Sequence, residues 1–157
     1  MTNIADRLKA LGIDLPNPVQ PVANYIPYRW SGSLLFISGQ IPLENGALPY
    51  LGKVGVDLSI EEGQAAARLC AINILAQVNA ALNGNLDRVN ACLKLGGFVN
   101  CAPDFKDQPT VINGASDLMV EVFGDNGRHA RAAVGSNALP RNVAVEVDAI
   151  FDCQPLP

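Results

Sequence analysis

The feature that most constrains the fold is a long amphipathic stretch at residues 59–84, SIEEGQAAARLCAINILAQVNAALNG. It begins with Ser59 and Glu62 in the spacing of a capping box, and it ends at Gly84, a residue type at which helices commonly stop. Between these ends, apolar residues recur with the spacing of one helical face: Ala65, Leu69, Ile72, Leu75, Val78 and Leu82. The stretch therefore predicts one long helix whose apolar face is covered by another layer of the protein.

The segments around this helix predict that layer. Residues 108–124, QPTVINGASDLMVEVFG, indicate a second helix, with Pro109 near its start and Gly124 just after it. Strand-like segments surround the helices: a hairpin over 28–38 that turns at Ser31 and Gly32, a strand at 88–100 with a bulge at Gly96 and Gly97, and strands near 129–135 and 142–152. This order predicts a single α+β domain in which both long helices pack on one face of a mixed sheet.

A short amphipathic helix is expected near residues 3–11, followed by the proline-rich linker DLPNPVQPV. We interpret residues 1–20 as an extension and residues 21–157 as the main domain. Charged residues interrupt the apolar positions of the helix: Asp6, Arg7 and Lys9. Because a signal peptide or a membrane span needs an unbroken apolar run, the expected location is the cytoplasm.

Composition argues against several classes of function. The 157 residues carry 11 basic and 15 acidic side chains, and they contain no basic run that could follow a nucleic-acid backbone. The cysteines lack the spacing of a zinc site and are expected to be buried, reduced thiols: Cys70, Cys92, Cys101 and Cys153. His129, the single histidine, lies beside Arg128 and is interpreted as a solvated loop residue. No cofactor is expected, because the glycine-rich phosphate-binding motifs are missing too.

The end of the chain places charged residues in strands. In NVAVEVDAIFD, period-two alternation separates an apolar side from a side that holds Ala144, Glu146 and Asp148. In the preceding segment the same parity groups His129, Arg131 and Ala133. A guanidinium carries a permanent charge and five donors, so Arg131 needs an anion. If the two strands are neighbours, Glu146 supplies that anion in an ion pair that orders the sheet; otherwise a ligand supplies it.

Two motifs, ISGQIP at residues 37–42 and ARAAVGSNALPRNVAVEVDAI at residues 130–150, resemble those of the RidA/YjgF family of imine deaminases. The fold of this family is similar to that of the small bacterial chorismate mutases, and the resemblance covers about residues 20–152. It implies hydrolysis of 2-imino acids, formed from unstable enamines, to 2-keto acids and ammonia without a metal or organic cofactor. It also implies a homotrimer with clefts between subunits, where one chain supplies Arg131 and its neighbour part of the wall.

The same resemblance implies a role for individual residues. Arg131 corresponds to the arginine that binds the substrate carboxylate, and Glu146 to the terminal-strand glutamate that orients or deprotonates the attacking water. The remaining correspondences are a pocket aromatic, the Ser-Gly pair at a strand end, a helix asparagine, and a position that holds a cysteine in many members: Tyr25, Ser38, Gly39, Asn113 and Ala133. With Ala133 in this chain, a thiol cannot be essential, although a backbone contact there would survive.

Two other functions are compatible with the motifs. A regulatory protein could hold a small carboxylate without converting it, because a fold does not determine chemistry. The endoribonuclease activity attached to the name of this family is the other candidate. An acidic composition, a single histidine and no interleaving of basic and aromatic residues argue against RNA as a substrate.

Overall fold

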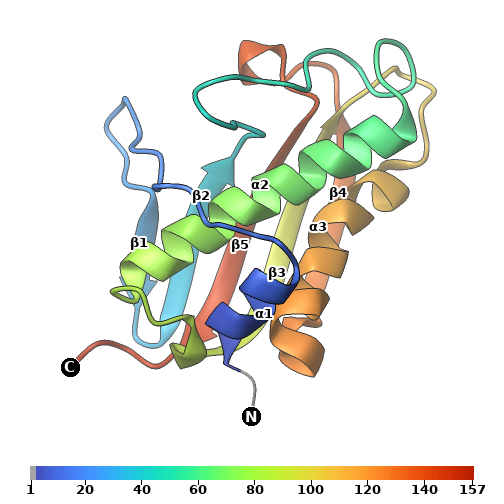
Figure 1. Cartoon of the computed structure of the whole chain (residues 1–157). Coiled ribbons are helices and arrows are strands. Elements are labelled where there is room, and N and C mark those ends of the chain that lie inside the picture. The colour runs from blue at the N-terminus through green and yellow to red at the C-terminus, as the bar shows by residue number, and fades with distance from the viewer. Residues whose placement is uncertain (1–2) are drawn as a thin grey trace.

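Five strands form one mixed sheet, and the two long helices cover one of its faces (Figure 1). The computed structural model describes residues 3–157. The strands are β1 (Tyr28–Ser31), β2 (Leu34–Gln40), β3 (Val89–Asn100), β4 (Ala130–Ser136) and β5 (Val145–Cys153). Their order in the sheet is β1-β2-β5-β3-β4, and only the pairing of β3 with β4 is parallel. The helices are α1 (Ile4–Ala10), α2 (Ile60–Ala81) and α3 (Gln108–Phe123). The predicted α+β architecture is therefore confirmed.

The capping box starts α2 as predicted. The Ser59 hydroxyl oxygen accepts from the Glu62 backbone N–H at 3.1 Å, and the Glu62 carboxylate accepts from the Ser59 backbone N–H at 2.7 Å. The buried face of α2 is wider than the predicted one, because the helix packs against both the sheet and α3. The linker also contacts α2, and the Gln77 side chain donates to the Val19 carbonyl at 2.7 Å. Ala65 and Ile72 of the predicted face are only half-buried. Several residues outside that face are fully buried: Ala66, Ala67, Cys70 and Ile74.

The expected bulge at Gly96 and Gly97 is wrong. The pairing of β3 with β5 runs without a shift from Lys94 to Val99, and the irregularities lie earlier in the strand. The two glycines instead allow close packing on both faces of the sheet. A Cβ atom on Gly97 would lie 2.6 Å from the Ile112 side chain of α3, and one on Gly96 would collide with the Asp148 carboxylate.

Alternation along the strands gives the sheet two different faces. The face under α2 and α3 carries fully buried side chains such as Leu35, Leu95 and Val147. The opposite face is only partly covered and holds Phe36, 40% exposed, and Val134, 46% exposed. The carboxylates of β5 also lie on this open face, because they alternate with the buried valines.

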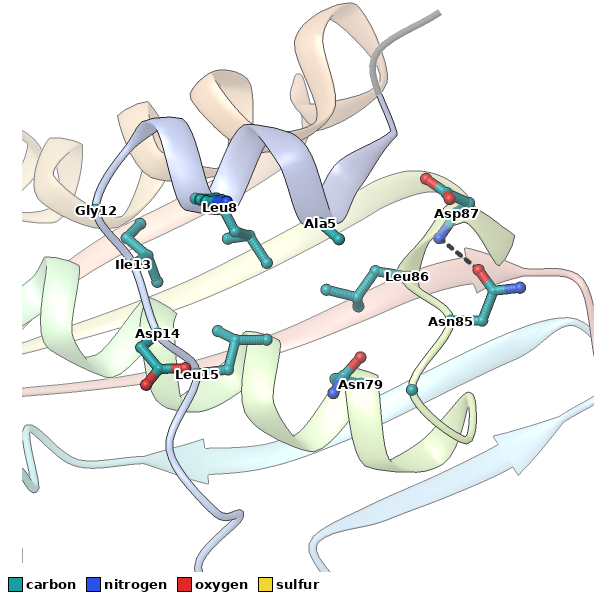
Figure 2. A pocket seen from close by; sticks show the side chains of 12 residues that line it. Ala5, Leu8, Gly12, Ile13, Asp14, Leu15, Asn79, Asn85, Leu86 and Asp87 are labelled. Atoms are coloured by element: carbon teal, nitrogen blue, oxygen red, sulfur yellow. Dashed lines mark hydrogen bonds between the residues drawn. The ribbon is translucent and has the colours of Figure 1, made fainter.

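The N-terminal segment packs on the rest of the protein. Leu8 of α1 is buried in the core, and Arg7 donates to the Val122 carbonyl of α3 at 3.0 Å. A cavity of about 640 Å³ lies between α1, the segment that follows it and the end of α2, with apolar side chains such as Leu15 and Leu86 in its wall (Figure 2). The division of the chain at residue 20 stays a prediction. Within residues 3–157, no helix combines the length and apolarity needed to cross a membrane.

Candidate active site

The first part of the candidate site is built around Arg131 on β4. Arg131 pairs with the buried Leu95 of β3, and its side chain extends toward α3. Its Nη1 donates to Asn113 Oδ1 at 2.8 Å and to Ser116 Oγ at 3.1 Å. Asn113 and Ser116 are three residues apart and therefore share one face of α3. The structure thus brings together two predicted site residues, Arg131 and Asn113, and adds Ser116, which the sequence analysis missed.

Arg131 has no carboxylate partner among residues 3–157. The ion pairs in this part of the chain are Arg68–Glu121 and Arg128–Asp125. The alternative in which Arg131 pairs with Glu146 is excluded, because β3 lies between β4 and β5 and the two side chains lie on opposite faces of the sheet. A half-buried guanidinium without an acidic partner fits the ligand alternative of the sequence analysis.

His129 completes this part of the site. Its Nδ1 lies 2.7 Å from the Gly127 carbonyl oxygen, and its Nε2 lies 2.9 Å from Ser116 Oγ. His129 does lie in the loop before β4, as predicted, but it is half-buried and hydrogen-bonded rather than solvated. The chain turns back onto α3 at Gly127, where a Cβ atom would collide with the Met119 carbonyl, and this turn brings the imidazole to Ser116.

The second part of the candidate site surrounds Glu146 on β5. Glu146 pairs with Phe98 of β3 on the open face, and its carboxylate lies against Gly39, where any side chain would collide with it. Gly39 belongs to the irregular end of β2, where the register with β5 shifts between Ile37 and Gln40. A glycine at this point therefore gives the carboxylate its space.

A cavity of about 340 Å³ opens beside this carboxylate. Four predicted site residues line it: Tyr25, Ser38, Gly39 and Glu146. The Ser38 hydroxyl donates to the Ile26 carbonyl at 2.7 Å, which holds the segment containing Tyr25 against β2. Arg141, with a left-handed backbone at φ +57°, also lines the cavity, although the sequence analysis gave it no role. Its place inside the motif ALPRNVAVEVDAI was the available signal.

The electrostatics of the open face suit proton transfer. Burial raises the pKa of the Glu146 carboxyl above its ordinary value, and the nearby Asp148 carboxylate raises it further. Burial also raises the pKa of Asp148. A carboxylate with a raised pKa is a stronger base than an ordinary glutamate, and a larger fraction of it is protonated and able to act as an acid near neutral pH.

The mixed sheet, the two helices on one face and the cavity at the end of β2 define a chorismate mutase-like α+β protein. Residues 5–151 match the family described as "YjgF/chorismate mutase-like, putative endoribonuclease". The chain therefore belongs to the YjgF family, which the motif resemblance had predicted.

Individual relatives extend over nearly the whole chain. The protein TCP17 of Trypanosoma cruzi is 49% identical over 150 residues, which cover 95% of this chain and 93% of that protein. A protein of unknown function from Agrobacterium tumefaciens has a solved structure that is 52% identical, with a TM-score of 0.91 over 96% of this chain and 92% of that one. A "putative endoribonuclease" from Shewanella oneidensis is 36% identical, with a TM-score of 0.93 over 96% and 99%.

Proposed function

We propose that the protein hydrolyses reactive 2-imino acids to 2-keto acids and ammonia. The observation that supports this most is the environment of Arg131. Its guanidinium has no acidic partner among residues 3–157, and of its three nitrogens only Nη1 donates hydrogen bonds to side chains of α3. The Nε and Nη2 donors, which form no hydrogen bond with residues 3–157, suit a planar carboxylate through two parallel charge-assisted hydrogen bonds. Such a contact fixes the position of the neighbouring imine carbon.

The two parts of the site do not meet within one chain. Arg131 and Glu146 lie two strands apart in the sheet, more than about 10 Å, and on opposite faces. Because β4 is an edge strand, a second copy of the chain can approach Arg131 from outside the sheet. We therefore place the complete site between two subunits of a homotrimer, with Arg131, Asn113 and Ala133 from one chain and the Glu146 cavity from its neighbour.

In this arrangement the residues perform addition of water followed by elimination of ammonia. Arg131 holds the substrate carboxylate, and the Glu146 carboxylate takes a proton from the water that adds to the imine carbon. The same carboxyl group then returns the proton to the nitrogen of the tetrahedral intermediate. As the C–N bond breaks and ammonia leaves, the hydroxyl group of the intermediate gives its proton back to the Glu146 carboxylate, and its oxygen becomes the keto oxygen of the 2-keto acid. Tyr25, at the mouth of the cavity, limits the access of other water to the intermediate.

The test is ammonia release from a 2-imino acid generated in solution by an amino-acid oxidase. We expect the purified protein to accelerate release well above the uncatalysed rate. A rate equal to that without protein would overturn the proposal. Binding of a 2-keto acid without any acceleration would indicate the non-catalytic carboxylate-binding function instead.

The proposed mechanism uses no thiol, and we expect the cysteines to be unreactive because they are buried. All four are free and buried, as predicted, and burial raises the pKa of Cys92 and of Cys153 to about 12. Because the thiolate is the reactive form, iodoacetamide should alkylate the folded protein far more slowly than the unfolded protein, and imine hydrolysis should not change. Thiol counting beside the ammonia assay checks this expectation. Loss of turnover in an alkylated but still folded sample would contradict it.

A further inference from the structure

We infer that Ser116 and His129 position the Arg131 guanidinium, so that a substrate carboxylate binds only along its Nε–Nη2 edge. The hydrogen-bond chain that supports this runs from the Gly127 carbonyl through His129 and Ser116 to Arg131. The identity of the ligand rests on the proposed function. The chain of hydrogen bonds itself rests on distances between atoms of this protein.

The direction of each hydrogen bond follows from the backbone carbonyl. A carbonyl oxygen only accepts, so His129 Nδ1 must carry the proton that it shares with Gly127 at 2.7 Å. In a neutral imidazole the other nitrogen, Nε2, is then an acceptor, and the Ser116 hydroxyl donates to it at 2.9 Å. With its proton directed at His129, Ser116 Oγ presents a lone pair to Arg131 Nη1 at 3.1 Å.

Two members of this hydrogen-bond chain, Gly127 and Ser116, are held in place by α3. Gly127 is buried and its Cα lies so close to the Met119 carbonyl of α3 that no side chain fits. Ser116 belongs to the same helix, three residues after Asn113. The helix therefore supplies two acceptors for Nη1, Asn113 Oδ1 at 2.8 Å and Ser116 Oγ.

This arrangement selects one edge of the guanidinium. The two hydrogen bonds use both protons of Nη1, which closes the end-on fork formed by Nη1 and Nη2. The side-on fork formed by Nε and Nη2 keeps its donors. An unrestrained arginine side chain would lose rotamer entropy when it binds a carboxylate, whereas the Arg131 side chain held by α3 has already lost that entropy. Ser116 and His129 therefore affect the affinity and the orientation of the carboxylate through Arg131.

The first experiment observes His129 directly. Because the chain has one histidine, the imidazole signals of ¹⁵N-labelled protein need no assignment to a position. In the neutral imidazole we expect a protonated Nδ1 and an unprotonated Nε2. In Ser116→Ala, the Nε2 signal should move because its donor is gone. A proton on Nε2 in the wild-type protein would overturn the inference, whatever the protein catalyses.

The second experiment uses matched variants, with pyruvate as the probe for binding and ammonia release for turnover. Ser116→Ala should weaken pyruvate binding and lower kcat/KM by about 10–100-fold, with a melting temperature near that of the wild type. His129→Gln keeps an acceptor near the position of Nε2 and should restore most of the affinity. His129→Asn reaches only the Gly127 carbonyl and should behave like Ser116→Ala. The double variant Ser116→Ala/His129→Asn should be no worse than either single variant, because the residues act in one chain of hydrogen bonds.

The outcomes separate this inference from the proposed function. If the wild-type protein binds pyruvate and Arg131→Lys weakens that binding, but Ser116→Ala and His129→Asn do not, positioning by these residues is overturned while the deaminase proposal stands. If His129→Gln and His129→Asn lose affinity equally, the role of the Nε2 acceptor is overturned. If the wild-type protein neither binds pyruvate nor releases ammonia, the proposed function fails, and the histidine spectrum still decides whether the hydrogen-bond chain exists.

Discussion

Replacement of Arg131 by alanine is expected to lower kcat/KM for imine hydrolysis by about 10³–10⁴-fold, because the substrate carboxylate loses both its charge partner and its orientation. The melting temperature should fall by only about 2–4 °C. Stability changes little because no carboxylate within residues 3–157 pairs with Arg131, so the substitution leaves no buried negative charge. Asn113 and Ser116 lose one donor but are half-buried and can reach water.

Arg131→Lys is the matched control for charge. Lysine keeps the positive charge but has no planar fork, so it cannot form two parallel bonds to a carboxylate. We expect this variant to fold like the wild type and to hydrolyse the imine slowly. Ammonia release and a melting curve for each variant provide the measurement. Near-normal ammonia release by Arg131→Ala would contradict the proposed role of the guanidinium. A large loss of stability in Arg131→Ala, with a normal specific activity of the protein that remains folded, would contradict it too.

Replacement of Glu146 by glutamine is expected to lower kcat by about 10²–10⁴-fold, because the amide cannot accept a proton from water. In the wild type, kcat should fall at acid pH as Glu146 becomes protonated, and the midpoint should lie above the ordinary glutamate pKa because burial and Asp148 both raise it. The measurement is kcat against pH for each protein. A Glu146→Gln enzyme with the same pH profile and rate as the wild type would rule out this carboxylate as the base.

Asp148→Asn is a matched control from the same strand and face. Asp148 also has a pKa raised by burial, but it lies over Gly96 and does not line the cavity that contains Glu146. This variant should keep its turnover within a few-fold. Because the Asp148 charge raises the pKa of Glu146, its removal should move the acid limb of the kcat profile to lower pH.

The raised pKa of Glu146 also has a consequence for stability. The folded protein binds a proton at this position more readily than the unfolded chain does. The stability contributed by the protonated carboxyl is therefore fully present below the ordinary glutamate pKa, and it is lost as the pH rises through the raised value. Glu146→Gln removes this loss, so its melting temperature should exceed that of the wild type at neutral pH and approach it at about pH 4. A lower melting temperature at neutral pH would contradict this assignment.

Local signals in the sequence predicted the elements well. The capping box at Ser59 and Glu62 starts α2, and Gly124 is the C-cap of α3, because these residues serve the unpaired backbone groups of the helix ends. Gly84 lies three residues after the last residue of α2. Strand parity was also predictable, and Glu146 does alternate with buried valines. Strand order was not. Arg131 and Glu146 lie on consecutive strands of the chain, yet β3 enters the sheet between them through contacts that no local pattern encodes.

The arrangement of the site was less predictable for a related reason. His129 looked solvated beside Arg128, because nothing local shows that Gly127 packs against α3. Ser116 could have been found, since it lies one helical turn after Asn113 and faces the same strand. The separation of the predicted residues into two parts follows from the sheet as a whole. No local pattern in the sequence predicts the intersubunit site that we propose; only the family resemblance implied it.

In the proposed mechanism two copies of the chain complete each site, and mixed oligomers can test this arrangement. Arg131→Ala and Glu146→Gln chains with different affinity tags are expressed together, and oligomers that contain both are isolated on the two tags. Light scattering should give about three times 16.6 kDa. A mixed trimer contains either two Arg131→Ala chains and one Glu146→Gln chain, or one Arg131→Ala chain and two Glu146→Gln chains. Each of these rings has one interface where an intact Arg131 meets an intact Glu146. We expect each parent oligomer to be nearly inactive and the mixed trimers to regain about one third of the wild-type rate. Mixed trimers as inactive as the two parents would contradict it.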